Sequence, residues 1–132
     1  MDWVASIHQA IQYIEEHLRE ELTIREIAQQ VALSPFYFQK GFAMLCGMTV
    51  GDYIRQRRLS AAGLEVLTTD RKIIDIALEF GYDSPDSFTK AFVRFHGLTP
   101  AALRKSGGAV RSFAPLRICL LYTSPSPRAV EE

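Results

Sequence analysis

Apolar residues recur at helical spacing from the start of the chain. One stripe, with steps of three and four residues, consists of Trp3, Ile7, Ile11, Ile14 and Leu18. Such spacing places all five side chains on one face of a helix. Asp2 stands just before the stripe, where a carboxylate can accept a hydrogen bond from a backbone N–H group of the first turn. The pattern predicts an N-capped helix of about 16 residues.

Two shorter helices are predicted further along. Thr23 and Glu26 match a capping box, in which each side chain satisfies the backbone N–H group of the other residue. The inward face of the helix that follows is expected to hold Ile24, Ile27, Ala28 and Val31. A matching short helix that ends at Gly81 is expected to turn inward Ile73, Ile76, Ala77 and Phe80.

Two helices of medium length begin and end alike. Each has Ser at the N-cap and Pro at the first helical position, in Ser34-Pro35 and Ser84-Pro85, and each stops at a glycine. We predict helices over residues 35–46 and 85–96. Their inward faces are expected to hold Phe38, Phe42 and Leu45 in the first helix and Phe88, Phe92 and Phe95 in the second.

A longer helix connects these parts. Thr49 caps a segment from Val50 to Leu67, about 18 residues or roughly 27 Å at the helical rise. Its inward positions are expected to include Tyr53, Ile54, Ala61, Leu64 and Leu67. Thr99-Pro100 begins a last short helix that reaches about Lys105. Strand signals are absent before Arg111, so the predicted fold is all-α with seven helices.

The helices form a repeat. Ser34, Pro35, Phe38, Lys40, Phe42, Gly47 and Thr49 recur 50 residues later, whereas the pair Ile27-Ala28 recurs after 49. The second copy therefore has one extra residue in its turn. A short helix joined by a tight turn to a second helix is the helix-turn-helix plan. The sequence predicts two homeodomain-like helix-turn-helix subdomains joined by the long linker helix.

Composition and charge refine this picture. The 132 residues are 48% hydrophobic with a formal net charge of +0, so wholesale disorder is excluded, and no apolar run is long enough to span a membrane. The N-terminus lacks the features of a secretory signal. The charge alternates in blocks: residues 34–58 and 84–105 each carry a net +3, between acidic segments. Each basic block contains one of the two Ser-capped helices, which favours contact with nucleic acid.

The outward positions of these helices are candidate base readers. On the first helix they are Phe36, Gln39 and Lys40, and on the second Asp86, Ser87 and Lys90. Gln can pair with adenine, Lys can donate to guanine or phosphate, and Ser tolerates several bases. Phe36 can contact a thymine methyl group or pack on a neighbouring loop. Asp86 can accept from cytosine, but we favour a stabilising role at the helix N-terminus.

Other polar residues are candidate phosphate contacts. Three arginines lie on the long helix and can meet phosphate or pair with acidic neighbours: Arg55, Arg57 and Arg58. Ser34, Thr89 and Arg94 complete this group. Because major-groove faces repeat every 34 Å or so along DNA, a rod of the predicted length can hold the two helices in successive grooves. One chain would then read two elements of an asymmetric site.

These residues resemble a known family. The run Tyr53-Ile54-Arg55, with Arg58-Leu59, and the run from Ile76 to Ser84, continued by Phe88, Phe92 and Gly97-Leu98-Thr99-Pro100, look like the DNA-binding domain of AraC/XylS-type transcription regulators. The resemblance covers roughly residues 3–107. It implies a cytoplasmic, nucleoid-associated bacterial regulator with seven helices that binds double-stranded DNA, with RNA polymerase as a further candidate partner. By position, the base readers named above match those of the family, with Pro85 added; Pro85 has no donor and departs from the polar residues often found there.

The remainder of the chain does not follow this plan. We expect residues 1–107 to form the double helix-turn-helix domain and residues 108–121 to be a linker and the possible start of a truncated effector-binding domain. Family members with an N-terminal DNA-binding domain usually continue into a gyrase-inhibitor-like domain, so an effector ligand is expected only if such a domain exists. Residues 122–132 change abruptly to small, polar and Pro-rich composition, and we interpret them as a non-native-looking or disordered tail.

An enzyme is not expected. His8 and His17 are too far apart on one helix to share a metal, and neither a phosphate-binding glycine loop nor a nucleophile elbow is present. Cys46 and His96 stand at equivalent repeat positions before the glycine stops, which points to roles at helix ends. No metal or cofactor is predicted. The alternative to DNA binding is a helical protein-interaction module without DNA affinity.

Overall fold

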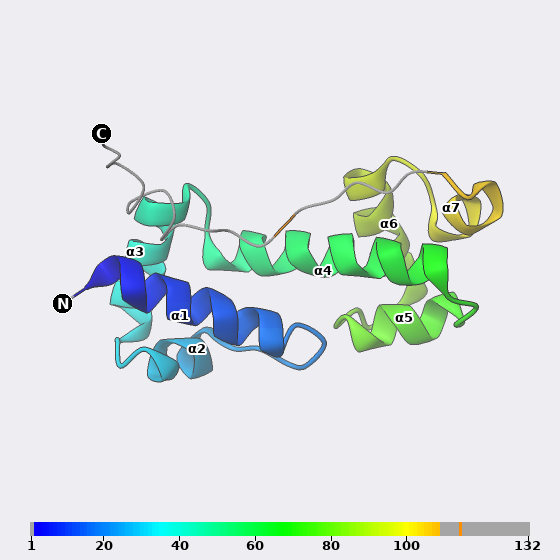
Figure 1. The fold of residues 1–132 in the computed structure, drawn as a ribbon. Coiled ribbons are helices and arrows are strands. Elements are labelled where there is room, and N and C mark those ends of the chain that lie inside the picture. Colours follow the sequence, from blue (N-terminus) through cyan, green and yellow to red (C-terminus); the bar gives the residue numbers. More distant parts are fainter. Residues whose placement is uncertain (1, 109–113, 115–132) are drawn as a thin grey trace, which may run out of the picture. The chain divides into compact units, whose positions relative to one another are not determined.

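Seven helices account for most of the part of the chain that the structure describes. The computed structural model describes residues 2–108 and Ala114 (Figure 1). In chain order the helices are α1 (Trp3–Glu16), α2 (Ile24–Gln30), α3 (Pro35–Cys46), α4 (Val50–Thr68), α5 (Ile73–Glu79), α6 (Pro85–His96) and α7 (Pro100–Ser106). None of these described residues lies in a strand. The predicted all-α class and the order of its helices are therefore confirmed.

The helices fall into two compact units. Within the described residues, the first unit comprises residues 2–17 and 22–53, and the second comprises residues 18–21 and 54–108. Helix α4 contributes its first residues to the first unit and the remainder to the second. Each unit contains one short helix followed by one Ser-capped helix, so the repeat in the sequence corresponds to a repeat in the fold.

Side-chain caps fix the starts of most helices. Asp2 accepts from the backbone N–H of Ala5 at 3.1 Å, and Thr23 and Glu26 form the expected capping box. Ser34 and Ser84 accept from the backbone N–H three residues ahead at 3.2 Å in both copies. Each such bond satisfies a donor that the helix itself leaves unpaired, and removing it typically costs about 1 kcal/mol.

The turn between the two helices of each copy contains a residue in the left-handed region. In the first copy this residue is Ala32, with φ of 57°, and in the second it is Gly81, with φ of 90°. The next residue then donates its backbone N–H back to the short helix, from Leu33 to Ala28 at 3.0 Å and from Tyr82 to Ala77 at 2.9 Å. The two turns thus close in the same way, although alanine tolerates this backbone conformation less well than glycine.

The first unit packs around aromatic rings. Phe42 lies 5.9 Å from the ring of Phe38 and 5.7 Å from the ring of Tyr53, and all three side chains are fully buried. Ile7 and Ile14 of α1 are also fully buried. The Tyr53 hydroxyl donates to the Glu15 carboxylate at 2.9 Å, which satisfies the one polar atom of this ring. The residues predicted to face inward on α1 and α3 therefore form most of this core.

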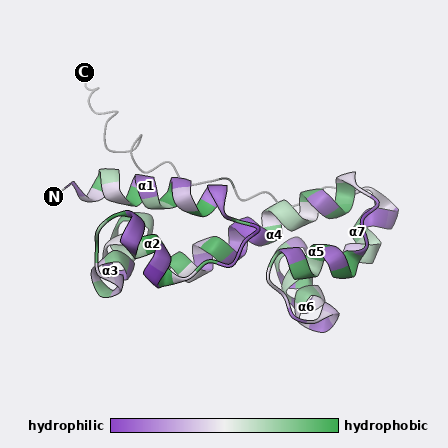
Figure 2. Cartoon of the chain, turned by 90° about the horizontal axis from the view of Figure 1, so that it is seen from below, coloured by the Kyte–Doolittle hydropathy of each residue, from purple (hydrophilic) through white to green (hydrophobic). Residues whose placement is uncertain are grey.

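The second unit has a core of its own. Its buried cluster consists of Ala62, Val66, Ile76, Ala77, Phe80, Phe88, Phe92 and Leu103. The Phe88 and Phe92 rings are 5.4 Å apart, and Tyr82 packs on Phe88 at the same distance. Figure 2 shows hydrophobic and hydrophilic residues alternating along the helices, as expected for helices that are buried on one side.

Several expectations for inward positions need correction, and five of these residues are only half-buried: Trp3, Ile24, Ala61, Leu67 and Ile73. Leu64 is 55% exposed, and α4 instead buries Leu59, Ala62 and Val66 in the second unit. The inward position expected for Leu64 is therefore wrong, and the buried residues of α4 belong partly to the first unit and partly to the second. Leu18 is buried as expected but lies beyond the end of α1, in the second unit. Leu45 is likewise only half-buried.

Part of the predicted domain organisation lies outside the described residues. The linker and truncated domain expected at 108–121 are described only at Gly108 and Ala114, and the tail expected at 122–132 is not described. The predicted DNA-binding domain, residues 1–107, is described except for Met1.

Candidate nucleic-acid interface

Helix α3 turns a mixed apolar and polar face outward. Phe38 and Phe42 anchor the helix in the core, and the opposite side presents Phe36, Gln39 and Lys40, all exposed. Phe36 is 66% exposed, so the alternative in which this ring packs away on a neighbouring loop is not what the structure shows. The three base-reading candidates of the first copy therefore share one accessible face.

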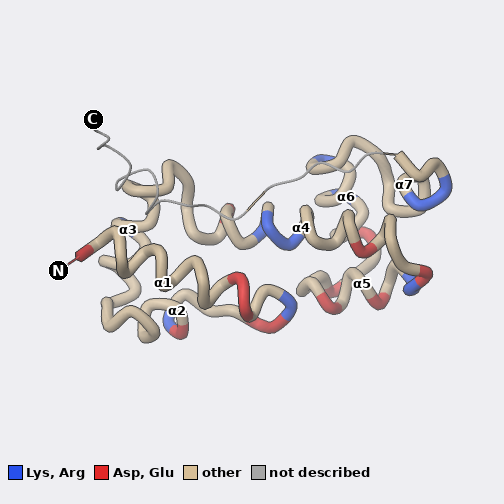
Figure 3. Tube along the Cα trace, viewed as in Figure 1, with Lys and Arg blue, Asp and Glu red and all other residues tan. Residues whose placement is uncertain are grey.

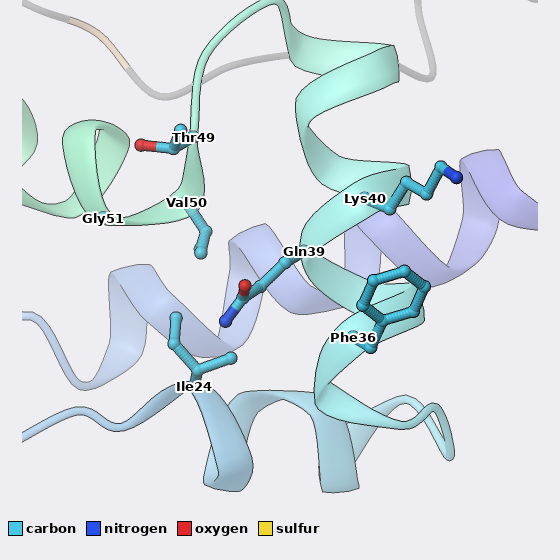
Figure 4. A pocket seen from close by; sticks show the side chains of 7 residues that line it. All are labelled: Ile24, Phe36, Gln39, Lys40, Thr49, Val50 and Gly51. Carbon is cyan, nitrogen blue, oxygen red and sulfur yellow. The ribbon is translucent and has the colours of Figure 1, made fainter.

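A shallow hollow of about 600 Å³ adjoins this face (Figure 4). Ile24 of α2 and Thr49, Val50 and Gly51 at the start of α4 form its other walls. In Figure 4 the Gln39 side chain points toward Val50 and Ile24, whereas the Phe36 and Lys40 side chains lie beside each other at the other edge of the same face of α3. The Lys40 ammonium lies 5.8 Å from the centre of the Phe36 ring, within the range of a cation–π contact.

Helix α6 presents the equivalent face in the second unit. Phe88 and Phe92 are fully buried, which leaves Asp86, Ser87 and Lys90 exposed on the outside. Asp86 lies in the first turn, where the helix dipole favours a carboxylate. Pro85 occupies the first position and is exposed, but it has no N–H group to donate.

Ser87 already has hydrogen-bond partners within its own helix end. Its hydroxyl donates to the Ser84 carbonyl oxygen at 3.1 Å and accepts from the Ser84 hydroxyl at 3.1 Å. Donating to a base through this hydroxyl would require exchange of its bond to the Ser84 carbonyl oxygen, whereas its second acceptor site can still take a hydrogen bond from a base amino group. Ser87 remains a candidate base reader, but a base that accepts from its hydroxyl must compete with the Ser84 carbonyl oxygen.

The six phosphate candidates lie in different environments. Ser34 is exposed and caps α3, and Thr89 is half-buried on α6. Arg55 and Arg94 are exposed and line one hollow of about 230 Å³ between α4 and α6 of the second unit. Arg57 is half-buried on α4. Figure 3 shows the basic residues of α4, α6 and α7 as blue segments of the second unit's chain.

Arg58 differs from the other candidates because its guanidinium is held by backbone carbonyls. Nε donates to the Leu18 carbonyl oxygen at 3.0 Å and Nη2 donates to that of Glu20 at 2.7 Å. Burial lowers the pKa of Arg58 below its ordinary value, although the group stays charged. These contacts fix residues 18–20 to α4, so the structure gives Arg58 a structural role, and its expected phosphate contact stays a prediction that this geometry disfavours.

A cluster of charged side chains next to Arg58 was not anticipated from the sequence. Arg19 contacts Glu65 at 3.1 Å and Glu79 at 3.2 Å, and Arg71 pairs with the same two carboxylates. The Arg19 guanidinium also lies 4.8 Å above the ring of Phe80. Arg19 lies far from both carboxylates in the sequence, and only the acidic character of the segment that contains Glu65 and Glu79 hinted at such pairing. They stabilise the second unit and leave fewer of its basic residues for a ligand.

The residues weighed for catalysis occupy structural positions. His96 lies with Nε2 2.8 Å from the Leu59 carbonyl oxygen and its ring 4.4 Å from that of Phe92. Burial raises the pKa of the Cys46 thiol to about 12, so it is not a thiolate at neutral pH. Among residues 2–108 no group of three or more His, Cys, Asp or Glu side chains is arranged to hold a metal. In the same part of the chain, no helix is both long and apolar enough to cross a bilayer.

Two capped helices, each closing a helix-turn-helix and each with an exposed polar face, define a helix-turn-helix DNA-binding protein. Comparisons with known proteins narrow this class. A family model described as "Helix-turn-helix domain" matches residues 27–106. The chain is 41% identical to the Regulatory protein SoxS of Escherichia coli over 98 residues, which are 74% of this chain and 92% of that protein. The chain belongs to the AraC/XylS-type family of helix-turn-helix transcription regulators, whose members bind specific DNA sequences.

Solved structures agree with this assignment. An AraC-type transcriptional regulator from Chromobacterium violaceum superposes with a TM-score of 0.73 over 79% of this chain and 93% of that chain, at 23% identity, and so confirms the fold. The DNA-binding domain of AdpA, determined in complex with a target DNA, superposes with a TM-score of 0.67 at 25% identity, over 76% of this chain and 90% of that chain. The function of this chain is thus sequence-specific DNA binding and transcription regulation.

Proposed function

We propose that α3 and α6 are two recognition helices that enter successive major grooves of one DNA duplex. The observation that carries this proposal is that each Ser-capped helix exposes side chains opposite its buried phenylalanines: Phe36, Gln39 and Lys40 on α3, and Asp86, Ser87 and Lys90 on α6. Because α4 belongs to both units, one chain carries both helices. The target site therefore needs no symmetry and consists of two different elements.

Each candidate base reader has a distinct part in this proposal. Gln39 pairs with the edge of an adenine, and Lys40 and Lys90 donate to guanine or to phosphate. The Phe36 ring contacts a thymine methyl group. Asp86 strengthens the N-terminus of α6. Ser87 accepts from a base amino group, and it donates to a base only where it gives up its bond to the Ser84 carbonyl oxygen.

The remaining parts of the proposal concern the setting of the protein. We place it in the bacterial cytoplasm, on the nucleoid, with RNA polymerase as a second partner and without enzymatic activity of its own. SoxS and the AdpA domain are similar proteins named as regulators, which supports this placement. Residues 1–107 suffice for DNA binding in this proposal. An effector ligand enters it only through a further domain beyond residue 107.

Selection of bound duplexes from a random library by the 132-residue chain tests the proposal. We expect an enriched, asymmetric motif with two elements about one helical turn apart. Repeating the selection at two salt concentrations separates phosphate from base contacts, because phosphate contact weakens steeply with salt. Salt-sensitive binding without enrichment would refute base reading by α3 and α6. Absence of binding at both concentrations would favour a protein-interaction module, for which the exposed Tyr37 and Met44 side chains are available.

A further inference from the structure

The two copies of the repeat have equivalent hollows with different linings. In the first unit a hollow of about 240 Å³ adjoins α3 and is lined by Trp3, Tyr37, Lys40, Gly41, Met44 and Leu45. In the second unit the hollow of about 230 Å³ beside α6 is lined by Arg55, Gln56, Leu59, Ala91, Arg94 and Phe95. Three lining positions correspond at the offset of 50 residues between the copies. Gly41, Met44 and Leu45 of the first hollow correspond to Ala91, Arg94 and Phe95 of the second.

The chemistry of the two hollows has diverged. The first is mainly apolar, with the Trp3 ring lying against the backbone of Gly41 and with Met44 77% exposed beside it. The second carries two arginines on an apolar floor in which Leu59 and Phe95 are buried. Both arginines are exposed at this hollow, and a guanidinium is a planar fork of donors that matches the oxygens of a phosphate.

The net charge of each unit follows the same division. Among the described residues, the first unit has five acidic side chains and two basic ones. The second unit has eight acidic and ten basic side chains. The first unit therefore carries a net negative charge, with Lys40 as the basic residue of α3, and the second carries a small net positive charge, which is the sign that favours a DNA backbone.

We propose that Arg55 and Arg94 hold one backbone phosphate of the DNA in the hollow of the second unit, and that the equivalent apolar hollow of the first unit makes no such contact. Gln56, at the same hollow, adds a neutral donor to the phosphate. The salt-dependent part of the affinity then resides mainly in the second unit. This inference rests on the proposed function, since it assumes that both units lie on DNA.

Salt dependence of duplex binding tests the proposal. The full chain is titrated into a fluorescein-labelled duplex of random sequence, about three helical turns long, between about 50 and 200 mM NaCl, and the slope of log affinity against log salt is measured. The variants are Arg55→Met, Arg94→Met and the pair together. Methionine keeps an apolar stem over Leu59 and Phe95, and thermal unfolding confirms that each variant folds.

We expect each single substitution to lower the slope by no more than about one, and the pair to lower it by about one in total, because one phosphate is lost. A loss of about two in the pair would mean two separate phosphates and would overturn the shared site. An unchanged slope in the pair would overturn the contact itself. If the unmodified chain binds no duplex at low salt, the proposed function fails as well.

Two further variants separate a local contact from a general effect of charge. Lys105→Met removes an exposed positive charge from α7 of the same unit, and we expect it to leave the slope unchanged. A decrease equal to that of Arg94→Met would show that only net charge matters. Met44→Arg places a guanidinium in the equivalent hollow of the first unit and should raise the slope by about one. No increase would overturn the equivalence of the two hollows.

Discussion

Nε2 of His96 lies 2.8 Å from the carbonyl oxygen of Leu59, and this contact links α6 to α4 within the second unit. The ring reaches that carbonyl because Gly63, one turn further along α4, has no side chain. A Cβ built on Gly63 would lie 2.5 Å from two atoms of the ring. The position of the His96 ring therefore requires a glycine at residue 63, although glycine in the interior of a helix otherwise weakens it.

We therefore expect Gly63→Ala to lower the free energy of unfolding by about 1–2 kcal/mol, as overpacking outweighs the gain in helix propensity. Chemical denaturation monitored by circular dichroism measures the change. Gly51→Ala is the matched control, because nothing lies within 4 Å of a Cβ at that position of the same helix. Equal stability of Gly63→Ala and the unmodified chain would contradict the role assigned to the His96 ring.

Gln39→Ala should relax base preference at one element of the target site. Loss of a bidentate contact to adenine costs about 1–3 kcal/mol against the preferred base only. Binding to the selected duplex and to duplexes with single base changes measures it. Gln12→Ala, at an exposed glutamine of α1, serves as control. Equal weakening of binding to all duplexes would show that Gln39 does not read a base and only lines the hollow beside α3.

Arg58→Met should destabilise the fold more than it alters DNA binding. Two charge-assisted hydrogen bonds to the carbonyls of Leu18 and Glu20 are lost, and we expect the free energy of unfolding to fall by about 2 kcal/mol. The salt slope of duplex binding should stay within error. Lys72→Met, at an exposed residue of the same unit, controls for charge. A stable variant with a lower slope would restore Arg58 as a phosphate contact.

The paired carboxylate of Glu79 makes stability depend on pH. Hydrogen bonds from Arg71 and Arg19 lower the pKa of Glu79 below its ordinary value of 4.5. A lowered pKa stabilises the folded state at every pH above the unfolded value, and this contribution is lost as the pH falls below 4.5 through the folded pKa. Glu79→Gln should thus be less stable than the unmodified chain at pH 7, and the difference should vanish in acid.

Thermal unfolding of both proteins from pH 7 to pH 3 measures this closing gap. Because the group is partly exposed, the difference at pH 7 should stay below about 1 kcal/mol and shrink further in about 1 M salt. A gap that is constant from neutral to acid pH would show that Glu79 acts through packing and not through its charge.

Two apolar residues of the second unit should respond differently to truncation. Phe92 is fully buried among aromatic rings, and Phe92→Ala should cost about 3–5 kcal/mol as a core cavity. Leu64 is 55% exposed, and Leu64→Ala should cost less than about 0.5 kcal/mol. Differential scanning calorimetry on both variants compares them. A large loss from Leu64→Ala would contradict the burial described for α4.

Local signals in the sequence were sufficient to predict most of the fold. Caps at Asp2, Thr23, Ser34 and Ser84 depend on residues three apart, and the structure confirms all of them. The inward position expected for Leu64 on α4 is wrong, because a helix shared between two units does not follow one periodicity over its whole length. The ion pairs of Arg19 and the carbonyl contacts of Arg58 join residues 38 to 60 positions apart, and no local sequence pattern predicts them. For the candidate site, exposure could be predicted from the helical wheel, whereas the partners of Ser87 and Arg58 could not.

Residues 18–21 belong to the second unit, although the chain enters them from α1 and leaves them toward α2. The duplicated halves are for this reason not interchangeable modules that a single cut could separate. A fragment starting at Ile54 would keep Arg58 but lose the carbonyls of Leu18 and Glu20 that hold its guanidinium. A fragment designed to contain the second unit, or one produced by gene rearrangement, must therefore include residues 18–21 as well as the chain from Ile54 onward.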